Sequence, residues 1–357
     1  MNTIGRYLSR EIYAATAFVL VAFLGLFAFF DLINELRDVG RGGYRLTHAF
    51  GFVGLSVPGH LYELGPIAVL IGTLYALSHL ASNSEFTVMR TAGFSPSHAA
   101  RTLARIGIPF VLIIVAVGEL VTPYAERAAQ QLRLVSLGAI IAQEFRSGLW
   151  VRADSRFVNV RTVRPDSTLE GVLMYEFDDE YRLRAISEAK TGRYAGNRIW
   201  MLEDVTQTRF ADAGTRVLHI AEMEWESVLT PEVLSVLMVE PQKMSAWNLF
   251  QYMRHLGANK QRTDRYEIAM WKKVFYPFAA LVMMALALPF GYVHARHGGV
   301  GVKVFSGIML GILFHGLNTL FSHVGLLQHW APLYAAMLPS LVFMIAAIGM
   351  MWWVERR

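Results

Sequence analysis

Residues 12 to 33 read IYAATAFVLVAFLGLFAFFDLI and contain one charged residue, Asp31, close to the end. A helix needs about 20 mainly apolar residues to cross the hydrocarbon core of a bilayer. The segment therefore predicts a membrane-spanning helix. It is too long for the apolar part of a typical cleavable signal peptide and lacks a small-x-small cleavage pattern, so we expect it to remain as the first span.

Five more apolar segments predict five further spans. They cover residues 50–80, 106–121, 274–293, 302–324 and 332–354. The first of these segments is interrupted by Pro58, Gly59, Glu63, Gly65 and Pro66. Because proline removes a backbone donor and kinks or breaks a helix, we expect a short helix there, followed by a full span over 66–80.

The middle of the chain, from about Gln143 to Arg265, has the composition of a soluble domain. Short β-branched and aromatic segments follow one another there at intervals of roughly 8–12 residues, which is typical of a sandwich or jelly roll. The strand candidates are 157–163, 171–177, 181–186, 198–202 and 216–225. Pro165 and Asp166 mark a turn between the first two.

The expected fold class is an α+β membrane protein: six transmembrane helices with an all-β, jelly-roll-like periplasmic domain inserted between spans three and four. The expected division is 1–142 for spans one to three, 143–243 for the β-domain, and 244–357 for a periplasmic helix and spans four to six. Two helices should flank the β-domain. Residues 123–142 continue span three beyond the membrane, and 245–255 form an amphipathic helix with Ser245 as its N-cap.

The distribution of Lys and Arg predicts the orientation. The residues that share one side of the predicted spans are Arg6, Arg10, Arg90, Arg101, Arg105, Arg296, Lys303, Arg356 and Arg357. Cytoplasmic loops carry an excess of Lys and Arg, so both termini should be cytoplasmic and the β-domain should face the periplasm, or the outside. Arg37, Arg41 and Arg45 in the first loop on the other side reduce the asymmetry.

The composition excludes several chemistries. The chain has no cysteine, which excludes disulfides, thiolate metal sites and a Cys nucleophile. The net charge of +5 comes largely from residues at span ends, which argues against nucleic acid as a partner. Residues 298–303 are glycine-rich but lack the ending of a Walker A motif, and no G-x-S-x-G nucleophile motif is present. We expect no cofactor on this chain, and ATP only on a partner.

Four histidines lie in or near spans four and five: His294, His297, His315 and His323. Their spacing is not that of a helical HxxxH pair, and no carboxylate accompanies them in those spans, so no metal site is expected. His315 and Asn318, one helical turn apart, should pack or line a cavity. Gly307 and Gly311 form a G-x-x-x-G motif that permits close helix approach, which suits both plain packing and a movable seam.

The loop between spans two and three reads SEFTVMRTAGFSP, residues 84 to 96. Phe86, Met89 and Arg90 recur at helical spacing. Gly93 suits a helix C-terminus, and Ser95 followed by proline suits the start of the next helix. The loop therefore predicts a short helix on the cytoplasmic face, which either receives force from a soluble subunit or is an ordinary connector on the bilayer surface.

This loop resembles the signature of the LptF/LptG permease family, and short motifs along the whole chain do so in the same order. They are Arg6-Tyr7, Gly40-Arg41-Gly42-Gly43-Tyr44, Ser56-Val57-Pro58, the 118–123 segment GELVTP, Gly148-Leu149-Trp150, Tyr266, and the 271–277 segment WKKVFYP. Gly148-Leu149-Trp150 and the 40–44 turn are more similar to the LptG branch than to LptF.

The resemblance implies a lipopolysaccharide exporter of the bacterial inner membrane. It implies a paralogous LptF-type permease, a cytoplasmic LptB-type ATPase dimer, a single-span LptC-type partner and an LptA-type periplasmic bridge. Spans one and five would form lateral gates around a lipid cavity. The residues expected to couple to the ATPase are Glu85, Phe86, Met89, Arg90 and Gly93, and those expected to line the cavity are Phe27, Phe30, Phe314 and Phe321.

The chain departs from the family at the outer end of span one. Similar members have lysines there as partners for lipid phosphates, whereas residues 31–38 of this chain contain only one basic residue, Arg37. Arg133, beyond span three, matches a basic family position and is the better candidate for phosphate binding, with Arg127 nearby. The alternative for each arginine is a solvated surface charge. Glu119 and Asp31 are either functional carboxylates or members of structural pairs with interfacial arginines.

Two other classes of function stay open from the residues alone. A passive scaffold joining the membrane to a periplasmic partner would not need the 84–96 loop. A lipid-modifying membrane enzyme would need acid, base or nucleophile residues clustered at one depth, and the sequence shows no such cluster.

Overall fold

The computed structural model describes residues 3–41, 43–137, 149–153, 156–163, 168–178, 180, 182–211, 214–227, 241–258, 262–292 and 299–356. Before the sheet, the helices are α1 (Thr3–Leu36), α2 (Leu46–Ser82), α3 (Glu85–Thr91), α4 (Pro96–Ala116), the π-helix η1 (Val117–Val121) and α5 (Thr122–Leu137). After it come η3 (Pro241–Lys243), α7 (Ala246–Ala258), α8 (Asp264–Phe275), η4 (Tyr276–Phe278), α9 (Ala279–Tyr292), α10 (Val300–Leu327) and α11 (Pro332–Glu355).

Six of the described helical segments are long and apolar enough to cross a membrane, which confirms the six predicted spans. They are Thr3–Leu36, Leu46–Ser82, Pro96–Arg133, Asp264–Tyr292, Val300–Leu327 and Pro332–Val354. The third is α4, η1 and α5 in series, so the predicted extension of span three is a helix as far as Leu137. The remaining predicted residues, 138–142, lie outside the described part of the chain.

The second span differs from its prediction. Instead of a short helix and a separate span, α2 is one helix of 37 residues with Pro58 and Pro66 inside it. Proline is tolerated within transmembrane helices because neighbouring helices and local adjustments satisfy the freed backbone groups. Most of the apolar part of α2 is buried between other helices, so packing along its length outweighs the local cost of each proline.

Between spans three and four the described strands form one antiparallel sheet. The strands are β1 (Leu149–Ala153), β2 (Arg156–Val163), β3 (Leu169–Phe177), β4 (Leu183–Gly196), β5 (Ile199–Ala211) and β6 (Gly214–Glu226). They pair in chain order, β1-β2-β3-β4-β5-β6. This confirms the α+β class with an inserted β-domain. The pairing is that of a meander, and Greek-key crossovers of a jelly roll do not occur among the described strands. The predicted turn at Pro165 and Asp166 lies outside the described residues.

One face of the sheet carries its own core. Alternate residues of β2 to β5 point to it, as the two-residue period of a strand requires. Trp200 on β5 and Trp225 on β6 are fully buried and pair across the two strands. The other members of this cluster are Val158, Val160, Leu169, Val172, Met174, Ala189, Leu202 and Val205.

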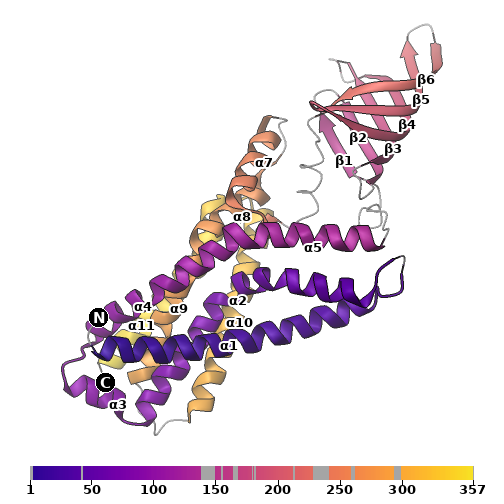
Figure 1. Ribbon diagram of the computed structural model, residues 1–357. Helices are drawn as coiled ribbons and strands as arrows, with labels where there is room; N and C mark the ends of the chain where they lie inside the picture. Colours follow the sequence, from indigo (N-terminus) through magenta and orange to yellow (C-terminus); the bar gives the residue numbers. More distant parts are fainter. Residues whose placement is uncertain are drawn as a thin grey trace.

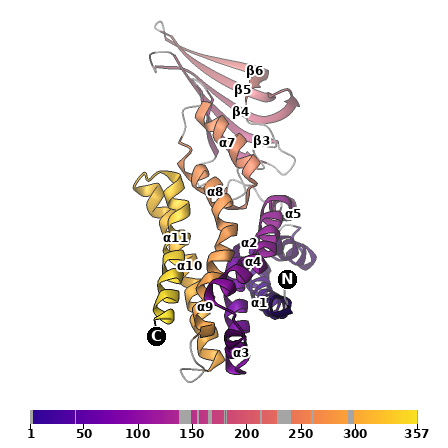
Figure 2. The ribbon, with the colours of Figure 1, turned by 90° about the vertical axis from the view of Figure 1, so that its left-hand side faces the viewer.

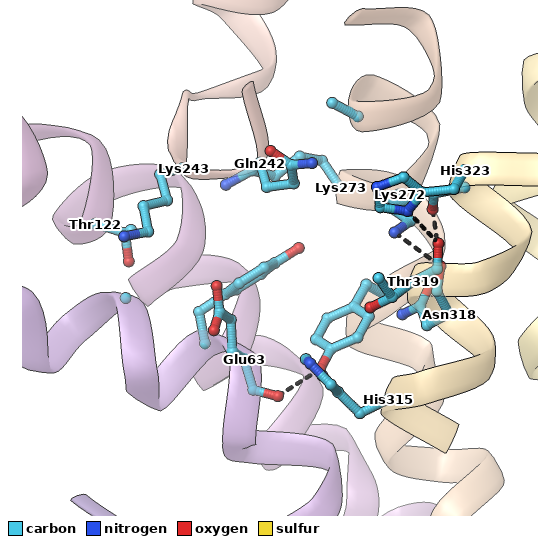
Figure 3. Close-up of a pocket in the computed structure, with 15 residues that line it drawn as sticks. Glu63, Thr122, Gln242, Lys243, Lys272, Lys273, His315, Asn318, Thr319 and His323 are labelled. Carbon is cyan, nitrogen blue, oxygen red and sulfur yellow. Dashed lines mark hydrogen bonds between the residues drawn. The ribbon is translucent and has the colours of Figure 1, made fainter. Parts of the chain in front are cut away.

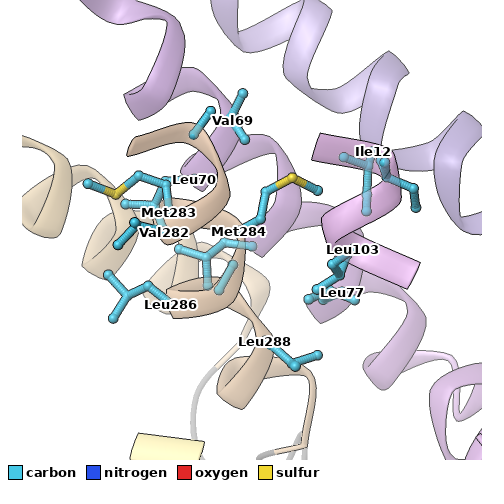
Figure 4. Packing of buried hydrophobic residues seen from close by; sticks show 14 of the residues in the cluster. Ile12, Val69, Leu70, Leu77, Leu103, Val282, Met283, Met284, Leu286 and Leu288 are labelled. Carbon is cyan, nitrogen blue, oxygen red and sulfur yellow. The ribbon is translucent and has the colours of Figure 1, made fainter. Parts of the chain in front are cut away.

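The core of the helical region is built around α2 and α9 (Figure 4). α1 lies against α2, where the absent side chain of Gly72 leaves room for the backbone of Thr16. α10 packs on the same helix through Gly307 and Gly311, whose missing Cβ atoms would lie 2.4 and 2.5 Å from side-chain atoms of Leu74 and Ile67. The predicted close approach is confirmed, and its partner is α2.

α1 packs mainly on α2, and α10 packs on α2 and α11, so that much of the surface of both helices stays exposed. In the most apolar stretch of each helix, only 6% of the residues of α1 and 22% of those of α10 are buried, against 83% for α2. Both termini and α3 lie at one end of the helical region, and the β-sheet lies beyond its other end (Figure 1). The same arrangement is visible from the side, with α7 between the spans and the sheet (Figure 2).

Candidate functional site

The short helix predicted in the 84–96 loop is present as α3. Its end is a Schellman motif: Gly93 has a φ of +91°, its N–H donates to the Arg90 carbonyl, and the Phe94 N–H donates to the Met89 carbonyl. Ser95 then caps α4 by accepting a hydrogen bond from the His98 N–H at 3.3 Å. Both predicted boundaries are confirmed.

Phe86, one of the residues expected to couple to the ATPase, does not face outward, so its side chain is not available for direct contact with another subunit. It is 2% exposed and packs edge-to-face against Tyr292 at the end of α9, with ring centroids 4.9 Å apart. Met89 is partly buried against the same core. The helix rotates these side chains inward because α2, α4 and α9 offer them an apolar surface. The apolar side chain that α3 does expose is Val88, at 65%.

Two polar contacts tie α3 to the spans beneath it. The Tyr7 hydroxyl of α1 donates a 2.9 Å hydrogen bond to the Glu85 carboxylate. The Arg90 guanidinium stacks over the Tyr292 ring at 4.9 Å. α3 is therefore connected directly to α1, an exposed span, and to α9, the central one.

The predicted phosphate-binding arginine, Arg133, belongs to an ion-pair cluster at the ends of α1 and α5 that lie toward the β-sheet. Its guanidinium lies 2.9 Å from the Asp38 carboxylate and 3.6 Å from that of Glu35. Glu35 also accepts a 2.6 Å hydrogen bond from the Tyr44 hydroxyl. Burial and this carboxylate raise the pKa of Tyr44 above its ordinary value. Asp38 pairs as well with the exposed Arg41.

The other predicted residues at this end, Arg37, Asp31 and Arg127, lie outside the Arg133 cluster. Arg37 is exposed, and its side chain has no ion pair with any described residue. Asp31 pairs with His60 of α2 at 2.6 Å, so it belongs to a structural pair, though with a histidine in place of the expected arginine. Arg127 stacks on Tyr124, 5.8 Å from the ring centroid.

The four residues predicted to line the cavity differ in exposure: the two on α1 are exposed, and the two on α10 are buried or partly buried. Phe27 and Phe30 of α1 are 37% and 53% exposed, as a lateral lipid-facing surface requires. Phe314 of α10 is fully buried against Phe343 of α11, so it is a packing residue and its expected place in the cavity is wrong. Phe321 is partly buried and lies against the Trp330 ring. The exposed apolar surface of α10 consists instead of Val302, Phe305, Met309, Ile312, Leu313, Leu320 and Leu327.

Glu119 is a structural carboxylate in the π-helix η1. It accepts a 2.8 Å hydrogen bond from the Ala246 N–H at the start of α7 and lies 3.6 Å from the Lys273 ammonium. Its partner is thus a lysine, where an arginine was expected. Ser245 accepts from the Asn248 N–H at 3.2 Å, which confirms it as the N-cap of α7.

Sequence reasoning missed a polar cavity of about 280 Å³ between α2 and α10, bounded above by α8 and η3 (Figure 3). Its charged residues are Glu63, Lys243, Lys272 and Lys273, and its other polar side chains belong to Tyr62, Thr122, Gln242, Tyr276, His315, Asn318, Thr319, Ser322 and His323. The predicted cavity position of His315 and Asn318 is confirmed. The WKKVFYP segment stood out only as a motif, because nothing local shows where its lysines point.

No group of three metal-ligating His, Asp or Glu side chains occurs within the described ranges. His294 and His297 lie outside them. The same holds for Arg296 and for the glycines at 42, 148 and 298.

The described chain has six helices long and apolar enough to cross a membrane, the short helix α3 at one end of them, and a β-sheet beyond the other end. These features define a polytopic membrane protein with an inserted β-domain. The chain belongs to the family described as "Lipopolysaccharide export system permease LptF/LptG", whose model matches residues 6–353. The resemblance found on the motifs is confirmed.

Individual relatives separate the two branches of the family. The lipopolysaccharide export system permease protein LptG of Haemophilus influenzae is 31% identical, with 100% of this chain and 99% of the relative covered. LptG of Escherichia coli K12 is 30% identical, with 98% of each covered. LptF of E. coli K12 is 20% identical, with 88% and 85% covered. The chain is of the LptG type.

Proposed function

We propose that this chain is the LptG-type permease subunit of a transporter that extracts lipopolysaccharide from the inner membrane and passes it toward the outer membrane. Its similarity to the two LptG relatives along nearly their full lengths supports this assignment. The structural observation that carries it is the pair of exposed apolar surfaces on α1 and α10, on helices that both pack on α2.

Those surfaces fit a paired permease. A second permease of the LptF type would place its own first and fifth spans opposite α10 and α1, which gives two lateral gates and a cavity between them. Phe27 and Phe30 lie on the exposed side of α1, where acyl chains would enter. Each buried methylene stabilises the bound lipid by about 0.8 kcal/mol, so the acyl chains would supply most of the affinity.

The energy would come from a cytoplasmic ATPase dimer of the LptB type, since the sequence has no Walker A motif. Such a subunit would press on α3, with Glu85, Arg90 and the exposed Val88 as its contacts. The Tyr7–Glu85 hydrogen bond and the Phe86–Tyr292 contact would carry that movement to α1 and α9. The chain itself would bind no cofactor and act as a transporter subunit.

The topology proposed is a multi-pass inner-membrane protein with both termini in the cytoplasm. The arginines near the termini and in the α3–α4 region support it. The division into 1–142, 143–243 and 244–357 follows, with the β-domain in the periplasm, where an LptC-type partner and an LptA-type bridge would receive the lipid.

Affinity purification of the full-length chain in mild detergent tests the proposal. We expect a paralogous permease and an ATPase to co-purify, lipopolysaccharide to be found by mass spectrometry, and lipopolysaccharide to stimulate ATP hydrolysis by the complex. A chain that purifies with a periplasmic partner but with neither ATPase nor lipopolysaccharide would be a scaffold. Conversion of a lipid by the chain alone would make it an enzyme.

A further inference from the structure

The polar cavity between α2, α8 and α10 contains three lysines, and two of them are already neutralised. Lys243 pairs with the buried Glu126 at 3.2 Å. Lys273 lies 3.6 Å from Glu119 and donates a 2.8 Å hydrogen bond to the Gly118 carbonyl. These two lysines tie η3 to α5 and α8 to η1, and they need no ligand.

The third lysine is different. The Lys272 ammonium donates to the Asn318 carbonyl at 3.1 Å and has no carboxylate within ion-pair distance among the described residues. Glu63 lines the α2 side of the same cavity, and its carboxylate likewise forms no ion pair with a described residue. The cavity therefore keeps one ammonium and one carboxylate on opposite walls, as Figure 3 shows.

Both charges lie within the length of membrane-spanning helices. Ionisable residues at such positions are costly, face a water-filled cavity or the bundle interior, and mark binding sites or pathways. The space is far larger than the ~30 Å³ that one water molecule occupies in the liquid. It lies just below the roughly 300–1,000 Å³ of typical ligand pockets, so it suits a headgroup and not a whole lipid. The hydroxyls of Thr319 and Ser322 and the ring of His315 add hydrogen-bonding groups on the α10 side.

We propose that this cavity is a subsite for a zwitterionic aminophosphate headgroup, with the phosphate at Lys272 and the ammonium at Glu63. A ligand with only a negative charge would be repelled by the Glu63 carboxylate, and a ligand with only a positive charge would be repelled by the Lys272 ammonium. A phosphoethanolamine group carries both charges and can pair with both side chains. The assignment rests on the proposed lipid-export function. Its chemistry fits two sources: a phospholipid with an ethanolamine headgroup, or a phosphoethanolamine substituent on lipopolysaccharide.

The test is lipid retention by the delipidated full-length chain, measured by native mass spectrometry. The probes are phosphatidylethanolamine, phosphatidylglycerol, phosphatidylcholine, and lipopolysaccharide with and without phosphoethanolamine. We expect Lys272→Met and Glu63→Gln each to weaken binding of the ethanolamine-bearing probe about tenfold, as the loss of one charge-assisted hydrogen bond implies. Lys272→Arg should stay within about twofold of the unsubstituted chain.

Lys303→Met is the matched control, because Lys303 also donates to a backbone carbonyl at 3.1 Å, at the other end of α10. It should leave retention unchanged. Equal losses in Lys303→Met and Lys272→Met, equal binding of phosphatidylglycerol and phosphatidylethanolamine, or no effect of either cavity substitution would overturn the proposal. Dependence on Lys272 for phosphatidylethanolamine, for the substituted lipopolysaccharide, or for both supports it and identifies the source.

A photo-crosslinker at Phe30 separates this subsite from the export function. If lipopolysaccharide is captured at Phe30 but Lys272→Met does not change lipid retention, the subsite proposal is wrong and the export proposal stands. If no lipopolysaccharide is captured at Phe30 in the chain without cavity substitutions, the result counts against the proposed export function.

Discussion

The Arg133 guanidinium lies 2.9 Å from the Asp38 carboxylate, across 95 residues of sequence, and joins α5 to the end of α1. Arg133, which we propose as a partner for a lipid phosphate, is thus already held by Glu35 of α1 and by Asp38 just beyond it. A lipid phosphate that bound there would compete with Asp38 for the guanidinium. Arg133 would then pair with Asp38 in the lipid-free protein and with the phosphate in the lipid-bound protein.

Replacing Arg133 by Ala should lower both stability and lipid capture. Glu35, almost fully buried, would keep only its bond from Tyr44, at a cost of about 1–3 kcal/mol. Arg41→Ala is the control, because that side chain is 72% exposed and such pairs contribute about 0–1 kcal/mol. Thermal unfolding and lipopolysaccharide crosslinking measure the two effects.

The double variant Arg133→Ala with Glu35→Gln separates structure from phosphate binding. It should regain thermal stability but not lipid capture. Recovery of both would mean that Arg133 acts only through its ion pairs.

On α3, the structure separates an exposed apolar side chain, Val88, from a buried one, Phe86. Val88→Asp should reduce the co-purified ATPase at least about fivefold with unchanged thermal stability, because Val88 is exposed. Phe86→Ala should destabilise the chain by about 3–5 kcal/mol, because it empties a filled core position. The opposite pattern in pull-down and melting experiments would place Phe86, and not Val88, at the interface.

Two glycines of α10 provide a matched pair for the contact with α2. A methyl group at Gly311 would lie 2.5 Å from the Ile67 side chain, whereas one at Gly316 meets nothing within 4 Å. Gly311→Ala should cost about 1–3 kcal/mol by overpacking and lower lipid-stimulated ATP hydrolysis. Gly316→Ala should change neither. Identical behaviour of the two variants would exclude a tight α2–α10 seam.

Reporter fusions test the orientation. A periplasm-dependent reporter inserted at residue 165 should be active, and cytoplasm-dependent reporters should be active after Arg101 and after the last residue. Reversed activity at any of the three positions would contradict the six-span topology with cytoplasmic termini.

The features that the sequence predicts well are local ones. Apolar runs identify all six spans, because crossing a bilayer requires a continuous segment. The boundaries at Gly93, Ser95 and Ser245 are also predictable, since each depends on hydrogen bonds within a few residues.

Rotation of a helix about its axis is not local. Phe86 and Phe314 carry the same apolar signal as Phe30, but they face inward because α9 and α11 lie beside them. The continuity of α2 through Pro58 likewise depends on the helices around it. The polar cavity was invisible for the same reason, since it brings together Glu63 and Lys272 from spans far apart in sequence.

The most direct measurement of the export function is photo-crosslinking of lipopolysaccharide in intact membranes, with the probe placed on different spans. Phe30 of α1 and Leu313 of α10 are exposed on the proposed gate helices, and Ile345 of α11, 65% exposed, is the control. We expect capture at Phe30 and Leu313 that decreases when the ATPase is allowed to turn over, and background labelling at Ile345. Labelling at Ile345 equal to that at Phe30, unaffected by ATP, would contradict a lipid path between spans one and five.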